Sequence, residues 1–367
     1  MTTHAAFYDQ LGPAQVIPVE NEDIGLKGIV VIDNVALGPA MGGIRMASDV
    51  TAQEVRRLAR AMTYKNAVAD LPHGGGKAAI MADPKQPAVQ KEKLIRAFAQ
   101  AIAPYTDYIP GPDMGTDETC MAWIQEEIGR VIGLPVSVGG IPLDELGTTG
   151  YGLAIAAEVA STYCKVTLSN ARVAIQGFGA VGQHAARFLA ERGATLVGVS
   201  DSRGTLYNPD GLDIDALIAA KRAGHSVVHA EVAAKVLPNS DIVALACDIW
   251  IPAARPDVVT GQNVKQLDTK LVLQGANIPF SPWAEKICCD RNILIVPDFI
   301  ANAGGIICGS VEYHGGTQAQ AFAQIEAKIR ENTALILEAA FKKKQLPRTA
   351  AIALATERIN RAQKPAA

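Results

Sequence analysis

The sequence predicts an α/β protein built from two domains, and three observations support this. At 367 residues the chain is longer than one ordinary domain. Apolar runs of strand length alternate with amphipathic helical segments along most of it. After the Gly/Pro-rich stretch Gly139–Pro142 this alternation becomes regular, as expected of a doubly wound parallel sheet.

Composition and charge narrow the class of protein. Apolar residues make up 49% of the chain and charged residues 19%, so a sizeable core can form. The net charge of −3 is not gathered in basic blocks, so we expect neither nucleic acid nor a membrane surface as a partner. No run of roughly eighteen apolar residues predicts a membrane span. The start, MTTHAAFYDQLG, lacks the features of a secretory signal, so we expect a cytoplasmic location.

The cysteines show no spacing typical of a zinc site or a disulfide framework. We therefore predict no metal site and ordinary thiols in a reducing compartment. The six are Cys120, Cys164, Cys247, Cys288, Cys289 and Cys308.

The first part of the chain combines strands and helices. Two apolar runs within residues 15–33 predict strands, and the glycines of Gly38–Gly43 predict a loop. Thr51 and Glu54 have the spacing of a capping box, which begins an amphipathic helix. Lys65 falls in the last turns of that helix, near its apolar stripe.

The stretch Met62–Ile80 joins that helix to a turn, a glycine run and a second lysine. Lys65 and Lys77 are twelve residues apart, and Gly74–Gly76 directly precede Lys77. A buried unpaired lysine is costly, and glycines are useful where a backbone turns sharply or approaches something closely. This pattern indicates a basic site for a small anionic substrate, with a solvated lysine after a flexible loop as the alternative. His73 either caps the turn or tunes Lys77.

A loop at Tyr108–Thr116 holds Asp113, between helices predicted at residues 89–103 and 117–128. A strand is predicted between Lys77 and the first of these helices, at Ala78–Met81.

A dinucleotide-binding fingerprint follows in the second half. The strand Ala171–Ile175 leads into Gly177–Gly182, with the pattern GxGxxG, and then into the helix Gln183–Arg192. The next strand ends at Asp201, nineteen residues after the last glycine. Such glycines allow a tight turn, close approach of a pyrophosphate and close helix packing, while the acid binds ribose. The segment is predicted to bind a dinucleotide.

Further strands are predicted at Asp241–Cys247, Leu271–Leu273 and Ile293–Val296. The turns Gly275–Asn277 and Asn302–Gly305 would then lie at the carboxyl ends of strands, where ligands bind in open α/β sheets. Residues 318–363 read as helices.

Taken together, the motifs resemble those of the amino-acid dehydrogenase family that acts on glutamate, leucine, valine and phenylalanine. Eight of them occur in order through most of the chain. They are Gly38–Arg45, Met62–Asn66, Leu71–Lys77, Pro112–Thr116, Thr149–Gly152, Gly177–Gly182, Gly275–Asn277 and Asn302–Gly305.

The resemblance implies reversible NAD-dependent oxidative deamination of an L-amino acid to its 2-oxo acid and ammonia. Lys65 matches the lysine that binds the substrate α-carboxylate, Lys77 the catalytic lysine and Asp113 the general acid/base. Asn277 matches the asparagine that holds substrate beside the nicotinamide, and Thr149 matches a threonine of the cleft. We expect burial and the charge of Lys65 to lower the pKa of Lys77 toward neutrality.

Two departures from the family pattern bear on the substrate. Glutamate-specific members carry a lysine where this chain has Met41 and a serine where it has Gly309. A buried side-chain carboxylate would then lack partners, which is costly. The expected apolar pocket favours an aromatic or, next, a branched-chain substrate, because its glycines leave room. Its predicted residues are Met41, Gly42, Gly111, Ile306 and Gly309. Glutamate dehydrogenase, with another residue supplying the cation, and a non-catalytic NAD-binding regulator are the alternatives.

The cofactor is expected to be NAD, because Asp201 would bind the ribose hydroxyls, although Arg203 could accept the phosphate of NADP. The predicted cofactor-binding residues are Gly177, Phe178, Gly179, Ala180, Val181, Gly182, Asp201, Ser202, Arg203 and Asn277.

The predicted domains are a substrate and oligomerisation domain, residues 1–147 joined by the C-terminal helices 329–367, and a Rossmann-type domain, residues 148–328. The resemblance implies a cleft between them and a homo-oligomer.

Overall fold

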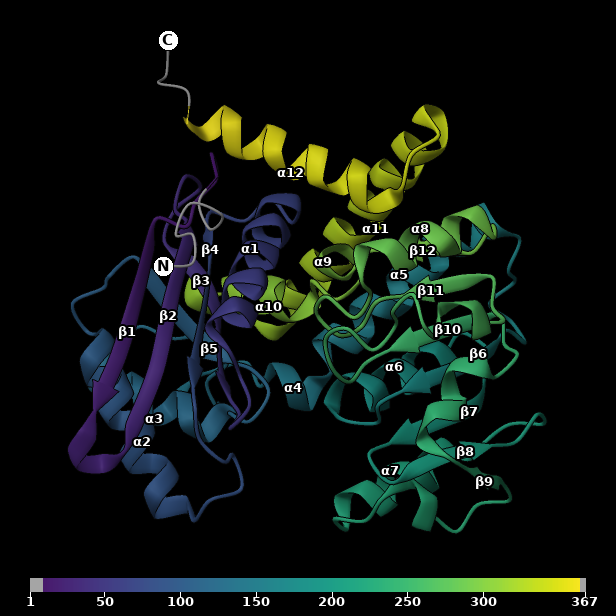
Figure 1. Cartoon of the computed structure of the whole chain (residues 1–367), viewed down its shortest axis with the longest axis horizontal. Helices are drawn as coiled ribbons and strands as arrows, with labels where there is room; N and C mark the ends of the chain where they lie inside the picture. The colour runs from purple at the N-terminus through teal and green to yellow at the C-terminus, as the bar shows by residue number, and fades with distance from the viewer. Residues whose placement is uncertain (1–8, 364–367) are drawn as a thin grey trace. The chain divides into compact units, whose positions relative to one another are not determined.

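A computed structural model describes residues 9–363 of the chain (Figure 1). Residues 1–8, and with them most of the segment assessed for a secretory signal, lie outside the described residues, as do residues 364–367. The described chain divides into two compact units. The first comprises the chain up to Leu143, Ile306–Phe322 and the chain from Leu354, and the second comprises Asp144–Gly305 and Ala323–Ala353. The predicted domain limits at 147/148 and 328/329 stay a prediction.

The first unit is a mixed five-stranded sheet with helices on both faces. Its strand order is β1-β2-β4-β3-β5, in which β3 pairs in parallel with both β4 and β5. Its elements are β1 (Gln15–Asn21), β2 (Leu26–Asn34), β3 (Ala40–Met46), α1 (Ala52–Val68), β4 (Gly74–Ile80), α2 (Ala88–Ile102), β5 (Tyr108–Pro112) and α3 (Glu118–Ile128).

Alternation along β2 shows how the sheet separates two layers of core. Val30 and Ile32 pack in the cluster under α2 and α3, whereas Ile29 and Val31 pack in the cluster under α1. Successive residues of a strand point to opposite faces, so one strand supplies both cores. The predicted capping box of α1 is confirmed, because the Glu54 amide donates to Thr51 Oγ1 at 3.2 Å.

The glycine run before Lys77 forms the first residues of β4 and Lys77 is buried, so the alternative of a solvated lysine after a flexible loop is wrong. A Cβ on Gly75 would stand 2.0 Å from the backbone nitrogen of Thr63 in α1. The glycines therefore remove side chains where a helix rests directly on a central strand. Lys77 consequently lies inside a strand, and α1 has a fixed position above it.

Two other predicted loops are strands as well. The Gly38–Gly43 segment contains the start of β3, and the Tyr108–Thr116 segment contains β5, which ends just before Asp113. A Cβ on Gly42 would stand 1.8 Å from the carbonyl oxygen of Gly76. Glycine and proline usually indicate loops, but here the neighbouring backbone demands their small size.

The second unit is a seven-stranded sheet, in the order β12-β11-β10-β6-β7-β8-β9 (Figure 1). The pairs from β12 to β7 are parallel, and β8 and β9 extend the edge antiparallel. The strands are β6 (Arg172–Gln176), β7 (Thr195–Asp201), β8 (Gly204–Tyr207), β9 (Lys235–Leu237), β10 (Ile249–Pro252), β11 (Leu271–Leu273) and β12 (Leu294–Val296). This confirms the predicted doubly wound α/β architecture.

Helices cover this sheet and continue from one unit into the other. Those within the second unit are α5 (Thr148–Cys164), α6 (Ala180–Ala190), α7 (Ile214–Arg222), α8 (Pro282–Asp290) and α9 (Asp298–Ala301). The short α4 (Leu143–Leu146) lies at the boundary, and α10 (Gly304–Tyr313), α11 (Gln318–Lys343) and α12 (Pro347–Gln363) each have residues in both units. None of the helices in the described residues has the length and apolar character needed to cross a membrane.

The strand predicted at Asp241–Cys247 is wrong. The chain forms a short 3₁₀ helix there, Asn239–Ala244, and the strand is β10, which follows it. A short apolar run fits a buried helical turn as well as a buried strand. Here the residues that pair with β6 and β11 are those of β10, which follows the predicted segment.

Because α1 lies directly against the glycines of β4, adding one methyl group there should lower the stability of the protein strongly. Gly75→Ala should destabilise the protein by about 3 kcal/mol, because the new Cβ has only the α1 backbone to displace. Gly179→Ala is the control, since a Cβ there meets no other atom within 4 Å. Denaturant unfolding of both variants measures the difference, and equal stabilities would contradict this view of the helix contact.

Candidate active site

Three charged side chains meet at the carboxyl ends of β3 and β5. Lys77 Nζ lies 2.7 Å from Asp113 Oδ1, and Arg45 Nε lies 2.7 Å from Asp113 Oδ2. Strand register brings them together: Ile44 of β3 pairs with Pro112 of β5, so the next residues, Arg45 and Asp113, are also neighbours. Lys77 and Arg45 are 2% and 4% exposed, so the cluster is buried.

Burial and mutual charge set the protonation of this cluster. Burial alone would raise the pKa of Asp113, but Lys77 and Arg45 outweigh it and hold that pKa well below its usual range. Burial lowers the pKa of Lys77, Arg45 lowers it further, and the attraction of Asp113 opposes both. The carboxylate is therefore ionised, and the lysine is shifted toward the neutral form that can act as a base.

Arg45 was not singled out in the sequence, although it ends the first matched motif. Besides Asp113, its Nη1 contacts Glu54 Oε1 in α1 at 2.5 Å. Arg45 is a neighbouring cation that lowers the pKa of Lys77, and the expected effect of Lys65 on that pKa stays a prediction. The sequence signal for this role is an arginine among apolar residues. The predicted loop at Gly38–Gly43 gave no reason to expect that arginine to be buried.

Lys65 occupies the last turn of α1, where it is 5% exposed. The adjacent Asn66 donates through Nδ2 to the carbonyl oxygen of Gly74 at 2.5 Å and to that of Met41 at 3.3 Å. These bonds hold the turn that carries Lys65 against β3 and β4, the strands that carry Arg45 and Lys77.

His73 lies buried directly before β4. Its ring stacks on that of His314, with centroids 5.3 Å apart, and meets Tyr313 edge-on. Neither ring nitrogen makes a hydrogen bond of normal length and angle. The expected capping of the turn by its side chain is therefore wrong, while an influence on Lys77 stays a prediction. Burial, assisted by His314, lowers the pKa of His73 to about 4, so it is neutral at pH 7.

The room predicted beside Gly111 and Gly309 is already filled. A Cβ on Gly111 would lie 2.7 Å from Ile132 Cγ1, and a Cβ on Gly309 would lie 2.4 Å from Ile132 Cδ1. Both glycines thus accommodate Ile132, which is 3% exposed. The size argument did not consider this side chain from a third segment, and the expectation that the two glycines enlarge a substrate pocket stays a prediction. Met41 and Ile306 are buried, and their predicted contact with the substrate stays a prediction.

In the second unit, the Asn302–Gly305 motif joins two other motifs. Asn302 Nδ2 donates to Asn277 Oδ1 and to the carbonyl oxygen of Gly275, each at 3.1 Å. Gly304 lies against the start of α5, where a Cβ would stand 2.0 Å from the carbonyl oxygen of Thr148. The segments that carry Thr149 and Asn277 are therefore held by one motif. Asn302 is a positioning residue that the sequence analysis did not assign.

The glycine fingerprint lies where the order of the parallel strands reverses, between β6 and β10. Gly177 has φ +96°, a Cβ on Gly179 would meet no atom within 4 Å, and a Cβ on Gly182 would stand 2.0 Å from the Gly177 carbonyl oxygen. Helix α6 begins next, without a side-chain cap. These are the three glycine roles of a dinucleotide site, and the amides of a first helical turn without a side-chain cap suit a phosphate. The residues fit a bound dinucleotide.

Asp201, at the end of β7, already accepts several hydrogen bonds. Its carboxylate receives the Ser226 hydroxyl at 2.8 Å, the Val227 amide at 2.9 Å, the Arg203 amide at 2.9 Å and Lys221 Nζ at 3.3 Å. Burial alone would raise the pKa of Asp201, but these bonds lower it below its ordinary value. The side chain is thus fixed and ionised, and its predicted ribose contact stays a prediction.

The predicted site residues are shared between the two units. The first holds Lys65, Lys77, Asp113, Met41, Gly42, Gly111, Ile306 and Gly309, and the second holds Thr149, Asn277, Gly177–Gly182, Asp201, Ser202 and Arg203. Among the residues from 9 to 363, no cluster of His, Cys, Asp or Glu could hold a metal ion.

The low pKa of Asp113 makes the buried cluster sensitive to acid. The folded pKa lies below the unfolded value of about 3.9, so the stabilisation is complete above roughly pH 4 and is lost as the pH falls through the folded pKa. At pH 7, Asp113→Asn should cost about 3–5 kcal/mol, because it leaves buried Lys77 without its anion and leaves Arg45 with Glu54 alone.

Urea unfolding of wild type and Asp113→Asn at pH 7 and pH 3 measures this difference, which should shrink in acid. Glu126→Gln is the control, because Glu126 contacts Arg96 at the surface with 63% of its side chain exposed. A difference that stays constant between the two pH values would contradict the assignment.

Comparison with known proteins agrees with this geometry. Residues 13–130 match the family described as Glu/Leu/Phe/Val dehydrogenase, dimerisation domain, and residues 139–366 match the family described as Glutamate/Leucine/Phenylalanine/Valine dehydrogenase. The chain is 38% identical to a glutamate dehydrogenase of Aeropyrum pernix, over 90% of this chain and 84% of that protein. It is 36% identical to an NAD-specific glutamate dehydrogenase of Staphylococcus aureus, over 89% and 81%.

Among solved structures, the hetero-hexameric glutamate dehydrogenase of Thermus thermophilus in a Leu-bound form is similar to this chain with a TM-score of 0.86. The two share 28% identity, and the match covers 96% of this chain and 89% of that one. The chain therefore belongs to the Glu/Leu/Phe/Val dehydrogenase family of amino-acid dehydrogenases.

Proposed function

We propose that the protein catalyses the reversible oxidative deamination of an L-amino acid, with NAD as the hydride acceptor. The observation that carries this is the buried Lys77–Asp113–Arg45 cluster, whose lysine is shifted toward neutrality beside an ionised carboxylate. A structural ion pair needs neither a second cation nor a lysine of lowered pKa, whereas general base catalysis needs such a lysine.

The cluster suits each proton step of this reaction. Lys65 would pair with the substrate α-carboxylate, and bound NAD would accept the hydride from Cα. Neutral Lys77 would take a proton from the water that attacks the resulting imine, and it would return that proton as ammonia leaves. Asp113, held as a carboxylate, would accept hydrogen bonds from the substrate nitrogen and orient it. The substrate ammonium group loses one proton before the hydride transfer, so the net products are the 2-oxo acid, ammonium, the reduced cofactor and one proton.

NAD is the favoured cofactor. Asp201 is fixed as an anion at the end of β7, where an acid suits ribose hydroxyls and repels a 2′-phosphate. The Staphylococcus relative is named NAD-specific. NADP is the alternative cofactor, because the Arg203 side chain is exposed next to Asp201 and could bind the phosphate of NADP.

Two substrates have specific support. Glutamate is favoured by kinship, since the relatives at 36–38% identity are named glutamate dehydrogenases. An apolar amino acid is favoured by Met41, which is fully buried and cannot pair a side-chain carboxylate. Because Ile132 fills the space beside Gly111 and Gly309, a branched-chain side chain now suits this second reading better than an aromatic one. Kinship is the broader support, so glutamate is the first candidate.

Assembly into a homo-oligomer is also proposed. The matched N-terminal family is described as a dimerisation domain, and the Thermus relative is described as hetero-hexameric. The cytoplasmic location predicted from composition stays a prediction.

Steady-state rates on a panel of L-amino acids, each with NAD and NADP, distinguish the substrates. Glutamate should have the highest kcat/KM under the first candidate, and leucine or valine under the second. If Met41 does exclude a side-chain carboxylate, Met41→Lys should raise the kcat/KM for glutamate relative to leucine by about tenfold or more. An unchanged ratio would remove Met41 from the specificity argument.

Replacing the proposed base tests the mechanism and the reading as a non-catalytic regulator. Lys77→Met should reduce turnover by at least about 100-fold, the contribution of one general base, while NAD binding, which involves the second unit, stays unchanged. Lys27→Met, which changes an exposed lysine of β2, should leave both unaffected. Wild-type protein without turnover on any amino acid would favour the regulator.

A further inference from the structure

A pocket of about 310 Å³ lies within the second unit. It is at the ends of the strands opposite to those that carry the glycine fingerprint. Lys270 and Ile293, which line it, directly precede β11 and β12, so the pocket is at the amino ends of these strands. The Gly275–Asn277 turn follows the carboxyl end of β11. The pocket volume lies at the lower end of the range typical of small-molecule sites.

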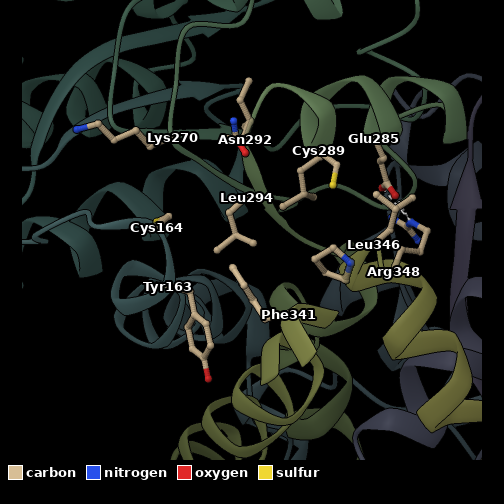
Figure 2. A pocket seen from close by; sticks show the side chains of 13 residues that line it. Tyr163, Cys164, Lys270, Glu285, Cys289, Asn292, Leu294, Phe341, Leu346 and Arg348 are labelled. Carbon is tan, nitrogen blue, oxygen red and sulfur yellow. Dashed lines mark hydrogen bonds and ion pairs between the residues drawn. The ribbon is translucent and has the colours of Figure 1, made fainter. Parts of the chain in front are cut away.

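Most of the pocket wall is apolar. Figure 2 shows Leu294 of β12, Cys289 of α8 and Phe341 of α11 around one space, with Leu346 from the α11–α12 turn beside them. The rings of Phe341 and Tyr163 lie 5.5 Å apart at its lower side. Phe341 is 54% exposed, so this side of the pocket is open to solvent.

One wall is a buried ion network. Arg348 Nε donates to both carboxylate oxygens of Glu285 at 2.8 Å, and its Nη2 donates to Asp298 Oδ1 at 2.8 Å and Gln274 Oε1 at 2.7 Å (Figure 2 shows the Arg348–Glu285 pair). Glu285 and Asp298 are 4% and 0% exposed. Arg348 and Glu285 line the pocket, whereas Asp298 and Gln274 lie behind them.

This network extends to the loop of Asn277, a residue predicted to contact the cofactor and the substrate. Asp298 Oδ2 accepts the Ile278 amide at 2.8 Å, directly after Asn277. Asn277 is itself held by Asn302. A ligand that shifts Arg348 would therefore shift the anchor of the Asn277 loop, through charged groups that are too buried to be left unpaired.

The polar groups at the pocket indicate what the ligand carries. The guanidinium of Arg348 can only donate hydrogen bonds, and among the described residues its Nη1 has no partner, whereas its Nε and Nη2 are engaged. Lys270, which also lines the pocket, is already paired with Asp248 Oδ1 at 2.9 Å. The pocket therefore suits a ligand with an apolar body and an oxygen that accepts a hydrogen bond.

We propose that this pocket is an effector site for a small apolar molecule with one acceptor oxygen, such as an aromatic ketone. Its occupancy alters nucleotide affinity through the Arg348–Asp298–Ile278 connection. The binding site stands independently of the proposed reaction, and only the effect on NAD rests on the proposed function.

Cys289 provides a direct test with wild-type protein. It lines the pocket and is exposed, whereas the other five cysteines are buried or partly buried. Acetophenone at millimolar concentration should slow alkylation of Cys289 severalfold, measured by peptide mass spectrometry. Toluene, which lacks the acceptor, should protect less. No protection by acetophenone overturns the site, and equal protection by toluene overturns the role of the acceptor oxygen.

Filling the pocket tests the same site without a ligand. Leu346→Trp places an indole in the pocket and should abolish protection of Cys289 by acetophenone. Leu335→Trp is the matched control, since Leu335 is an exposed residue of α11 outside the pocket. Persistent protection in Leu346→Trp would overturn the location.

The coupling is measured as the Kd for NAD, by fluorescence titration with and without acetophenone. We expect at least a twofold change in wild type, and no effect of acetophenone in Leu346→Trp. An unchanged Kd in wild type, with Cys289 protected, overturns the coupling while leaving the site. Because neither readout requires turnover, an enzyme inactive on every amino acid would refute the proposed function without affecting this test.

Discussion

The carboxylate of Asp113, held between Lys77 and Arg45, is the interaction on which the candidate active site depends. Removing three charged groups from water is expensive, and the cluster exists only because each charge has a close partner. The arrangement of strands β3, β4 and β5 supplies these partners in register. The same burial that makes the cluster costly lowers the pKa of Lys77, so stability and chemistry have one physical origin.

Close backbone contacts make that cluster possible. Because β4 begins with three glycines, α1 rests on the strand backbone, and Asn66 ties the helix turn of Lys65 to both neighbouring strands. In the second unit, Asn302 and Gly304 act similarly, holding the Asn277 turn and the start of α5. In both units, small or amide-bearing residues set distances between elements, and the reactive groups follow from those distances.

Small residues at such contacts also explain where the predictions from sequence differ from the fold. Glycine and proline were taken as loop formers in two segments that contain strands, because local propensity does not include the close approach of a neighbouring backbone. The argument from pocket size was incomplete for a related reason. Whether Gly111 and Gly309 leave space depends on Ile132, which comes from a different segment of the chain. A size argument from two positions cannot include a third that only folding brings near.

The two-domain α/β class, the dinucleotide fingerprint and the family could be predicted from the sequence, as could the site candidates Lys65, Lys77 and Asp113. These depend on local periodicity and on motifs whose spacing is set along the chain. The fold was needed to show that Arg45 is the second cation on Asp113, that Ile132 lies beside the two glycines, and that Arg348 connects a far pocket to the Asn277 loop. Each of these joins residues distant in sequence, and their energies depend on burial and on distances that no local pattern records.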